Sequence, residues 1–284
     1  MHKFLSFDKN QIKKICQEID YKGYSILGKI ITDEFLELLN KRTYDLMMGN
    51  VKYEGMFFKL DDPDGNYFNI KHQDVQNEVF QGPSERYKKI KDLEYDPFFL
   101  ELAQCDIFKE ICNERIGNNV SSMRAMILNK SRFNSSILPF HQDVSENWAM
   151  SDKPNFTVWV SLNGATKKNG CLKVIEGSHK HGVIGDGNNL LDKDLQNRHL
   201  DDSKIKYLEL EKGEACIFTN YTLHGSDKNE TNINRLGYTI CFMDSSIYHK
   251  KTKKTYPVIF GDNALTQDYI KNLKSIPKKV YELV

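Results

Sequence analysis

The chain has 284 residues, and its 40 lysines and arginines nearly balance its 39 aspartates and glutamates. A formal net charge of +1 gives no overall field that attracts nucleic acid or an anionic membrane, so neither is expected as a partner. The first ten residues lack the apolar core of a signal peptide, and no apolar run approaches the roughly 18 residues of a membrane span. The six cysteines form no Cys-x-x-Cys pair, which indicates free thiols in a reducing compartment. We expect a soluble, cytoplasmic protein that acts on a small molecule.

The first 119 residues are predicted to be mostly helical. Apolar side chains recur at intervals of three and four in two stretches, and Asp8 and Thr32 stand where N-caps are expected. The expected elements are helices at 9–19, 32–48, 97–104 and 107–115, a strand at 24–30, and loops with short strands over 51–85.

From residue 120 the apolar period changes to two, which predicts strands. The strand candidates are 120–130, 155–164, 171–175, 206–210, 215–219 and 235–243. Helices followed by antiparallel strands predict a mainly β fold, a barrel or sandwich buttressed by N-terminal helices. We expect one domain, with a helical part at 1–119, a β core at 120–244 and a C-terminal extension at 245–284. The polar segment 179–204 is either a lid beside the site or a surface loop.

His141-Gln142-Asp143 and the distant His224 form a candidate metal site. Residues two apart on a strand point to the same side, so His141 and Asp143 can reach one metal while Gln142 turns away. Two imidazoles and one carboxylate occupy one face of an octahedral iron(II) and leave three positions free for oxygen chemistry. Arg235 follows, and its planar guanidinium suits the far carboxylate of a cosubstrate, for which 2-oxoglutarate is the natural candidate.

The same tripeptide occurs a second time, as His72-Gln73-Asp74. A bare His-x-Asp is weak evidence for a metal site, so the context of each copy has to separate them. The apolar stretch 137–140 precedes His141, whereas His72 lies in the polar stretch 69–78. We therefore predict that the copy at His141 binds the metal.

Several segments together resemble the phytanoyl-CoA dioxygenase family of iron(II)- and 2-oxoglutarate-dependent oxygenases. They are His141-Gln142-Asp143, Asn169-Gly170-Cys171-Leu172-Lys173-Val174-Ile175, Glu176-Gly177-Ser178-His179-Lys180, Leu223-His224-Gly225-Ser226 and Arg235. The resemblance is firmest over 124–244. It implies a double-stranded β-helix, the cupin-like jelly-roll barrel, with Fe(II) in its mouth and 2-oxoglutarate and O2 as cosubstrates.

The resemblance also implies roles for individual residues. His141, Asp143 and His224 match the iron ligands of the family. Arg235 matches the arginine that binds the distal carboxylate of 2-oxoglutarate, and Ser226 falls where a hydroxyl assists it. The remaining positions that match cosubstrate contacts are Trp159, Met126 and Lys89.

The alternation of side chains between the two faces of a strand, here called side-chain parity, gives an independent expectation for the barrel interior. If Arg235 points inward, the small residues Gly237, Thr239 and Cys241 share its face, and the large ones between them pack under the helices. The same rule groups Trp159 with the polar residues of 155–164, and a purely structural position in the aromatic core is the alternative.

Parity also places Arg124 beside Met126, so Arg124 is predicted to point into the same cavity. An inward arginine needs an anion, and we expect a phosphate, phosphonate or carboxylate of the primary substrate. A structural ion pair is the alternative. Gln142, between two ligands, is the second candidate for contact with the substrate.

The sequence thus predicts a dioxygenase that hydroxylates an unactivated C–H bond of a small, anionic metabolite and releases succinate and CO2. Halogenases of this superfamily lack the carboxylate ligand, so Asp143 favours hydroxylation. Two other functions stay open: a non-catalytic jelly-roll binding protein, and a zinc-dependent hydrolase that uses the same triad. Zinc chemistry would not require Arg235.

Overall fold

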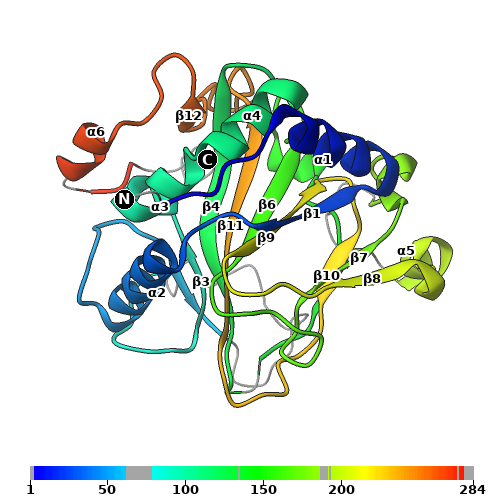
Figure 1. The fold of residues 1–284 in the computed structure, drawn as a ribbon, viewed down its shortest axis with the longest axis horizontal. Helices are drawn as coiled ribbons and strands as arrows, with labels where there is room; N and C mark the ends of the chain where they lie inside the picture. The colour runs from blue at the N-terminus through cyan, green and yellow to red at the C-terminus, as the bar shows by residue number, and fades with distance from the viewer. Residues whose placement is uncertain are drawn as a thin grey trace.

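The fold was analysed in a computed structural model, which describes residues 3–61, 79–133, 135–185, 191, 193–273 and 275–277. The second tripeptide, His72-Gln73-Asp74, lies outside these residues. Two antiparallel sheets dominate the structure and form the predicted jelly roll (Figure 1). The larger has eight strands in the order β1-β9-β6-β11-β4-β3-β2, with β12 beside β4, and the smaller has four in the order β5-β10-β7-β8.

Most strands of the core begin and end within two or three residues of the predicted limits. In the larger sheet the strands are β1 (Tyr24–Lys29), β2 (Phe58–Leu60), β3 (Tyr87–Lys91), β4 (Val120–Lys130), β6 (Phe156–Ser161), β9 (Glu214–Thr219), β11 (Arg235–Asp244) and β12 (Val258–Phe260). In the smaller sheet they are β5 (Leu138–His141), β7 (Leu172–Ile175), β8 (Ile205–Leu208) and β10 (His224–Ser226).

The helices are α1 (Lys9–Lys22), α2 (Asp33–Met48), α3 (Pro97–Ala103), α4 (Asp106–Arg115), α5 (Lys193–His199) and α6 (Gln267–Lys271). Asp8 caps α1 in a capping box with Gln11, and Thr32 caps α2, as the sequence predicts. Figure 1 shows α5 beside β7 and β8, on the opposite side of the molecule from α2 and α6. Among the described residues, no helix has both the length and the apolar character of a membrane span.

The main hydrophobic core lies between the helices and one face of the larger sheet. Its members include Ile15 and Phe35 from the helices and Val158 and Ile240 from the strands. On the opposite face, Trp159, Cys216 and Phe218 belong to a second cluster between the two sheets. The predicted alternation of side chains between the two faces of β6 and β11 is therefore confirmed.

All six cysteines are free thiols.

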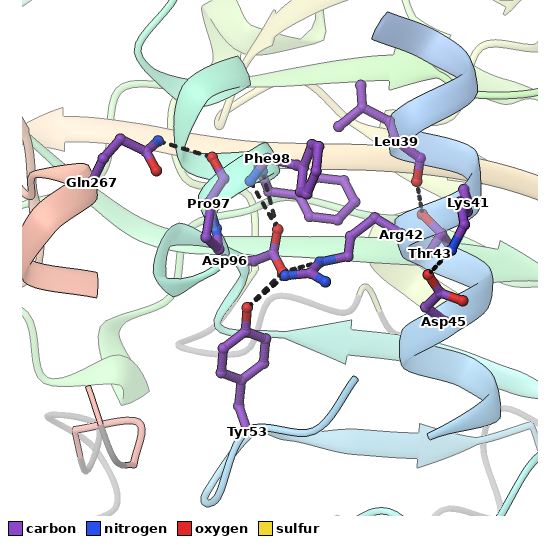
Figure 2. A network of polar contacts seen from close by, with 11 residues as sticks. Leu39, Lys41, Arg42, Thr43, Asp45, Tyr53, Asp96, Pro97, Phe98 and Gln267 are labelled. Atoms are coloured by element: carbon purple, nitrogen blue, oxygen red, sulfur yellow. Dashed lines mark hydrogen bonds and ion pairs between the residues drawn. The ribbon is translucent and has the colours of Figure 1, made fainter. Parts of the chain in front are cut away.

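Helix α2 is attached to the start of α3 by a polar network around Asp96 (Figure 2). Asp96 accepts hydrogen bonds from Arg42 Nε at 2.7 Å and from the Tyr53 hydroxyl at 3.0 Å. Its other carboxylate oxygen accepts from the Phe98 amide and caps α3. Because Asp96 is fully buried, this pairing satisfies a charge that would otherwise destabilise the helical layer.

Candidate metal centre and cosubstrate cavity

The three predicted ligands lie together where the smaller sheet faces the larger one. His141 ends β5, His224 begins β10, and the two residues are direct partners in the strand ladder. Each of the three residues offers one potential ligand atom, and these three atoms lie within 4.8 Å of one another; the residues are His141, Asp143 and His224. The Nε2 atoms of His141 and His224 lie 3.9 and 3.6 Å from the two carboxylate oxygens of Asp143. Antiparallel pairing of β5 with β10 thus brings together residues that are 83 positions apart.

Backbone contacts orient both imidazole rings. His141 Nδ1 lies 2.9 Å from the carbonyl oxygen of Pro139, and His224 Nδ1 lies 2.9 Å from that of Thr222. A carbonyl can only accept, so each Nδ1 carries the proton and each Nε2 presents a lone pair toward the common point. Burial lowers the pKa of His141 to about 3 and also lowers the pKa of His224. Both rings are therefore neutral, which metal binding requires.

Asp143 is held from two sides. The guanidinium of Arg124 contacts its Oδ2 atom, and its backbone amide donates to the carbonyl oxygen of Asn220 at 2.8 Å. Burial alone would raise the pKa of Asp143, but the charge and hydrogen bond of Arg124 lower it below its usual range. One ionised carboxylate and two neutral imidazoles are the donor set that suits iron(II), so the residues fit the implied metal.

A cavity of about 160 Å³ leads away from the three ligands between the two sheets. Every residue matched to a cosubstrate contact lines it: Arg235, Ser226, Trp159, Met126 and Lys89. Arg124 lines it too, which confirms its predicted inward direction. Lys88 and Lys130 also line the cavity and were not predicted. Lys130 shares the parity of Arg124 and Met126 on β4, so the same rule extended to the end of the strand identifies it.

Arg235 is a buried cation at the cavity wall, with 5% of its surface exposed. Its guanidinium lies over the Trp159 ring at 5.3 Å, and its Nε atom has no hydrogen-bond partner within the described residues. Burial lowers the pKa of Arg235 to about 10, so it stays charged at neutral pH. A buried charge with an unsatisfied donor is costly unless an anion occupies the cavity.

Gly237 makes room for the Trp159 indole. A Cβ atom at this position would lie 2.2 Å from Trp159 Cζ2, which is far closer than any van der Waals contact. Because glycine has no side chain, the indole can lie against β11 one step from Arg235. The small inner face predicted for this strand therefore has a specific purpose, which is to position the tryptophan.

Gln142, which the sequence predicts as a substrate contact, makes its side-chain hydrogen bonds to the backbone of other segments. The Gln142 side chain does not line the cavity, and its amide nitrogen donates to the carbonyl oxygens of Gly182 and Tyr221 at 2.8 and 2.6 Å. Its amide oxygen accepts from the Ile184 backbone at 2.8 Å. The residue between the two ligands therefore attaches the segment after β7 to the ligand strand.

The described part of the segment 179–204 packs behind the smaller sheet. Ile184, Leu191 and Leu195 form a cluster with Phe140 and Leu223, which are chain neighbours of the two histidine ligands. Since alternate residues point to opposite faces, this cluster lies on the side of the sheet away from the metal site. The described residues of this segment support the ligand strands and do not cover the cavity.

Comparisons with known proteins were made for both sequence and structure. The family described as Phytanoyl-CoA dioxygenase (PhyH) matches residues 19–237. "Phytanoyl-CoA dioxygenase 1" of Oryza sativa subsp. japonica is 25% identical over 264 residues, which are 80% of this chain and 86% of the relative. "Probable phytanoyl-CoA dioxygenase" of Caenorhabditis elegans is 25% identical over 223 residues, 74% of this chain and 68% of the relative.

Solved structures with the same fold hold the implied groups. The epimerase SnoN, in complex with Fe3+, alpha ketoglutarate and nogalamycin RO, superposes with a TM-score of 0.66 at 13% identity and covers 96% of this chain and 94% of its own. EctD from S. alaskensis, with 2-oxoglutarate and 5-hydroxyectoine, gives 0.61 at 18% identity over 98% and 89%. At these identities the likeness shows the fold. Because the family match extends over most of the sequence, the chain belongs to the phytanoyl-CoA dioxygenase family of iron(II)- and 2-oxoglutarate-dependent oxygenases.

Proposed function

We propose that this dioxygenase hydroxylates an unactivated C–H bond of a small, anionic metabolite. The observation that carries the proposal is a single cavity with a complete triad of His141, Asp143 and His224 in its wall and buried cations around it. The iron triad and the 2-oxoglutarate site supply the oxidant, and the surplus of positive charge is available for a substrate anion.

Bound iron(II) with 2-oxoglutarate and O2 supplies the oxidising power, through decarboxylation of the cosubstrate to succinate and CO2. The chain's own residues bind and orient. In this proposal His141, Asp143 and His224 hold the metal, and Arg235 with Ser226 holds the distal carboxylate of the cosubstrate. Asp143 keeps the carboxylate that a halogenase lacks, which favours transfer of a hydroxyl group to the substrate.

The anionic character of the substrate is supported by the five cationic side chains that line the cavity against two carboxylates, since 2-oxoglutarate does not need all of them. Lys89, which matches a cosubstrate contact, shows how crowded these charges are. Burial first, and then the charges of neighbouring cations, lower the pKa of Lys89 to about 7; these cations are Lys91, Arg124, Lys88 and Lys59. Within the described residues Lys89 has no ion-pair partner. An anion beside Lys89 would relieve this repulsion.

Arg124 remains the candidate for contact with the substrate anion. A guanidinium carries five N–H donors, so its contact with Asp143 does not prevent a further anionic partner. The cavity of about 160 Å³ is smaller than the roughly 300–1,000 Å³ of pockets for drug-sized ligands, which favours a small guest.

The test is succinate formation by the full chain with iron(II), ascorbate and 2-oxoglutarate, in the presence of a panel of small carboxylates and phosphorylated or phosphonate metabolites. A true substrate should raise the rate of succinate release and gain one oxygen atom by mass spectrometry. His141→Ala is the matched inactive control.

Two outcomes would contradict the proposal. Zinc-supported turnover without 2-oxoglutarate would identify a hydrolase, for which Arg235 has no use. Tight binding of a metabolite with no succinate above the His141→Ala level would identify a binding protein.

A further inference from the structure

Two buried cations face each other across the strand ladder at the cavity end of β4 and β11. Lys130 and Arg235 are direct partners in the antiparallel register, and both line the cavity. Their exposed fractions are 6% and 5%. Like charges directly opposite each other destabilise a sheet, and burial makes the cost larger because water no longer screens them.

The described part of the protein provides no carboxylate dedicated to this pair. Lys130 Nζ donates to the carbonyl oxygen of Ser136 at 2.7 Å, which leaves two further N–H donors on the ammonium. The acidic groups near Lys130 are Asp61 and Asp227, and each forms an ion pair with another lysine. Asp61 lies 3.7 Å from Lys88 Nζ, and Asp227 lies 2.5 Å from Lys173 Nζ.

The course of the Lys130 side chain is fixed by a glycine. Gly170 has a φ of +79°, and a Cβ atom there would lie 2.7 Å from Lys130 Cδ. The lysine stem therefore passes over Gly170 into the cavity.

The position of Lys130 relative to the metal ligands is also informative. Lys130 and Arg124 lie on the same face of β4, six residues apart. Arg124 contacts Asp143 and so marks the metal end of the strand, whereas Lys130 marks the opposite end. The distal carboxylate of a cosubstrate bound to the metal at its other end would therefore reach toward Lys130 and Arg235.

We infer that Lys130 and Arg235 form a two-cation receptor for the distal carboxylate of 2-oxoglutarate, and that this receptor binds dicarboxylates without the metal. A carboxylate between the two side chains accepts charge-assisted hydrogen bonds from both and replaces repulsion by attraction. The inference uses the family's cosubstrate and does not depend on the identity of the primary substrate. Burial and the charge of Arg235 lower the pKa of Lys130 to about 7, consistent with a cation that has no anion at its side.

The probe for the test is glutarate, which has both carboxylates of 2-oxoglutarate but lacks the keto oxygen for chelation. The full chain is treated with a chelator and titrated with glutarate by calorimetry. Quenching of Trp159, whose ring lies against Arg235, gives a second signal. Wild-type protein should bind glutarate, and Lys130→Met should weaken binding about 10- to 100-fold, as expected for loss of a hydrogen bond to a charged group.

Three further variants make the test specific. Lys130→Arg keeps the charge and should retain affinity within a few-fold. Lys212→Met removes an exposed lysine that does not line the cavity, and it should leave affinity unchanged. Arg235→Met combined with Lys130→Met should be less damaging than the sum of the single changes, since both donors serve one carboxylate.

Thermal unfolding distinguishes this role from a structural one. Without ligand, Lys130→Met should unfold at the wild-type temperature or above it, because a buried like charge is removed, and glutarate should no longer stabilise it. Glutarate binding by Lys130→Met within two-fold of wild type would overturn the inference. So would a lower unfolding temperature with an intact shift on addition of glutarate. If Lys130→Met does not fold, weak binding by a folded Lys130→Arg would overturn it as well.

Discussion

The guanidinium of Arg124 contacts the Oδ2 atom of Asp143, so a cation of the larger sheet holds the single carboxylate of the proposed metal site. The same guanidinium lies over the Trp148 ring at 5.8 Å, which restricts its position. An ion pair of this kind orients the carboxylate before the metal arrives and lowers the cost of keeping it ionised.

Replacing Arg124 by glutamine should therefore weaken metal binding. We expect about a 10- to 100-fold loss of affinity for iron(II), because partners that orient metal ligands contribute at this level. Cobalt(II) titration followed by visible absorption measures it, with Arg235→Met as a control that leaves metal affinity near wild type. Unchanged metal affinity with a raised KM for the primary substrate would instead support the role of Arg124 in substrate binding.

The two copies of the tripeptide provide a matched pair of variants. His141→Ala should abolish succinate formation and reduce bound iron to background, because the metal loses one of its protein ligands. His72→Ala should leave both unchanged. Iron content per chain and succinate release are the measurements, and a loss of iron on His72→Ala would show that context did not identify the site correctly.

Gly237→Ala tests the packing of Trp159 against β11. The added methyl group meets the indole at 2.2 Å in the present geometry, so the ring must move. We expect a loss of about 1–3 kcal/mol in the free energy of unfolding, as for other overpacked positions, and weaker binding of 2-oxoglutarate. Urea unfolding gives the first quantity. A second substitution, Trp159→Phe, should recover part of the stability, and its failure to do so would place the strain elsewhere.

Gln142→Leu should loosen the segment after β7 without affecting the substrate directly. The substitution removes the hydrogen bonds to Gly182, Tyr221 and Ile184, and unsatisfied buried backbone groups cost about 1–3 kcal/mol each. Hydrogen exchange at the Ile184 amide should accelerate, while the KM for the primary substrate stays at the wild-type value. A raised KM with unchanged exchange would restore the predicted contact with substrate.

The affinity for glutarate or 2-oxoglutarate should fall as pH rises above about 7. The pKa of Lys130 is lowered to about 7 in the free protein, by burial first and then by Arg235, with Lys173 adding to the effect and Asp61 and Asp227 opposing it. A bound carboxylate favours the charged form, so above this pKa binding takes up a proton and weakens.

Calorimetric titration from about pH 6 to about pH 9 tests this dependence. Lys130→Arg should show a flatter profile than wild type, since arginine stays charged over this range. The pKa of Lys89 is also lowered to about 7, and its contribution is common to both proteins. Identical profiles would mean that Lys130 does not titrate at the cosubstrate site.

The sequence predicts best those strands whose two faces have different surroundings. In β4, β6 and β11 one face packs under the helices and the other lines the cavity. Residue types therefore alternate along these strands, and this alternation is visible in the sequence. Strand β3 was not predicted. Its lysines Lys88, Lys89 and Lys91 lie beside apolar residues on both faces and obscure the alternation. Two of these lysines, Lys88 and Lys89, line the cavity, and this role becomes visible only when β3 is paired with β4.

The contacts that join distant segments could not be predicted. Gln142 was considered from its neighbours in the sequence, but its partners are 40 residues or more away. The same holds for the ladder that pairs Lys130 with Arg235, since parity gives the face of each residue and not the register between strands. The metal triad was easier to predict from the sequence because coordination chemistry dictates its residue types and their spacing.

The proposed metal ligands and the proposed cosubstrate cations belong to different sheets. His141 and His224 stand on β5 and β10 of the smaller sheet, while Lys130 and Arg235 stand on β4 and β11 of the larger one. A cosubstrate could chelate the metal at one end and reach these cations at the other. Such a molecule would link the two sheets of the barrel reversibly. Binding of such a molecule would stabilise the pairing of the two sheets, so the short strands of the smaller sheet should resist proteases longer when iron(II) and 2-oxoglutarate are present.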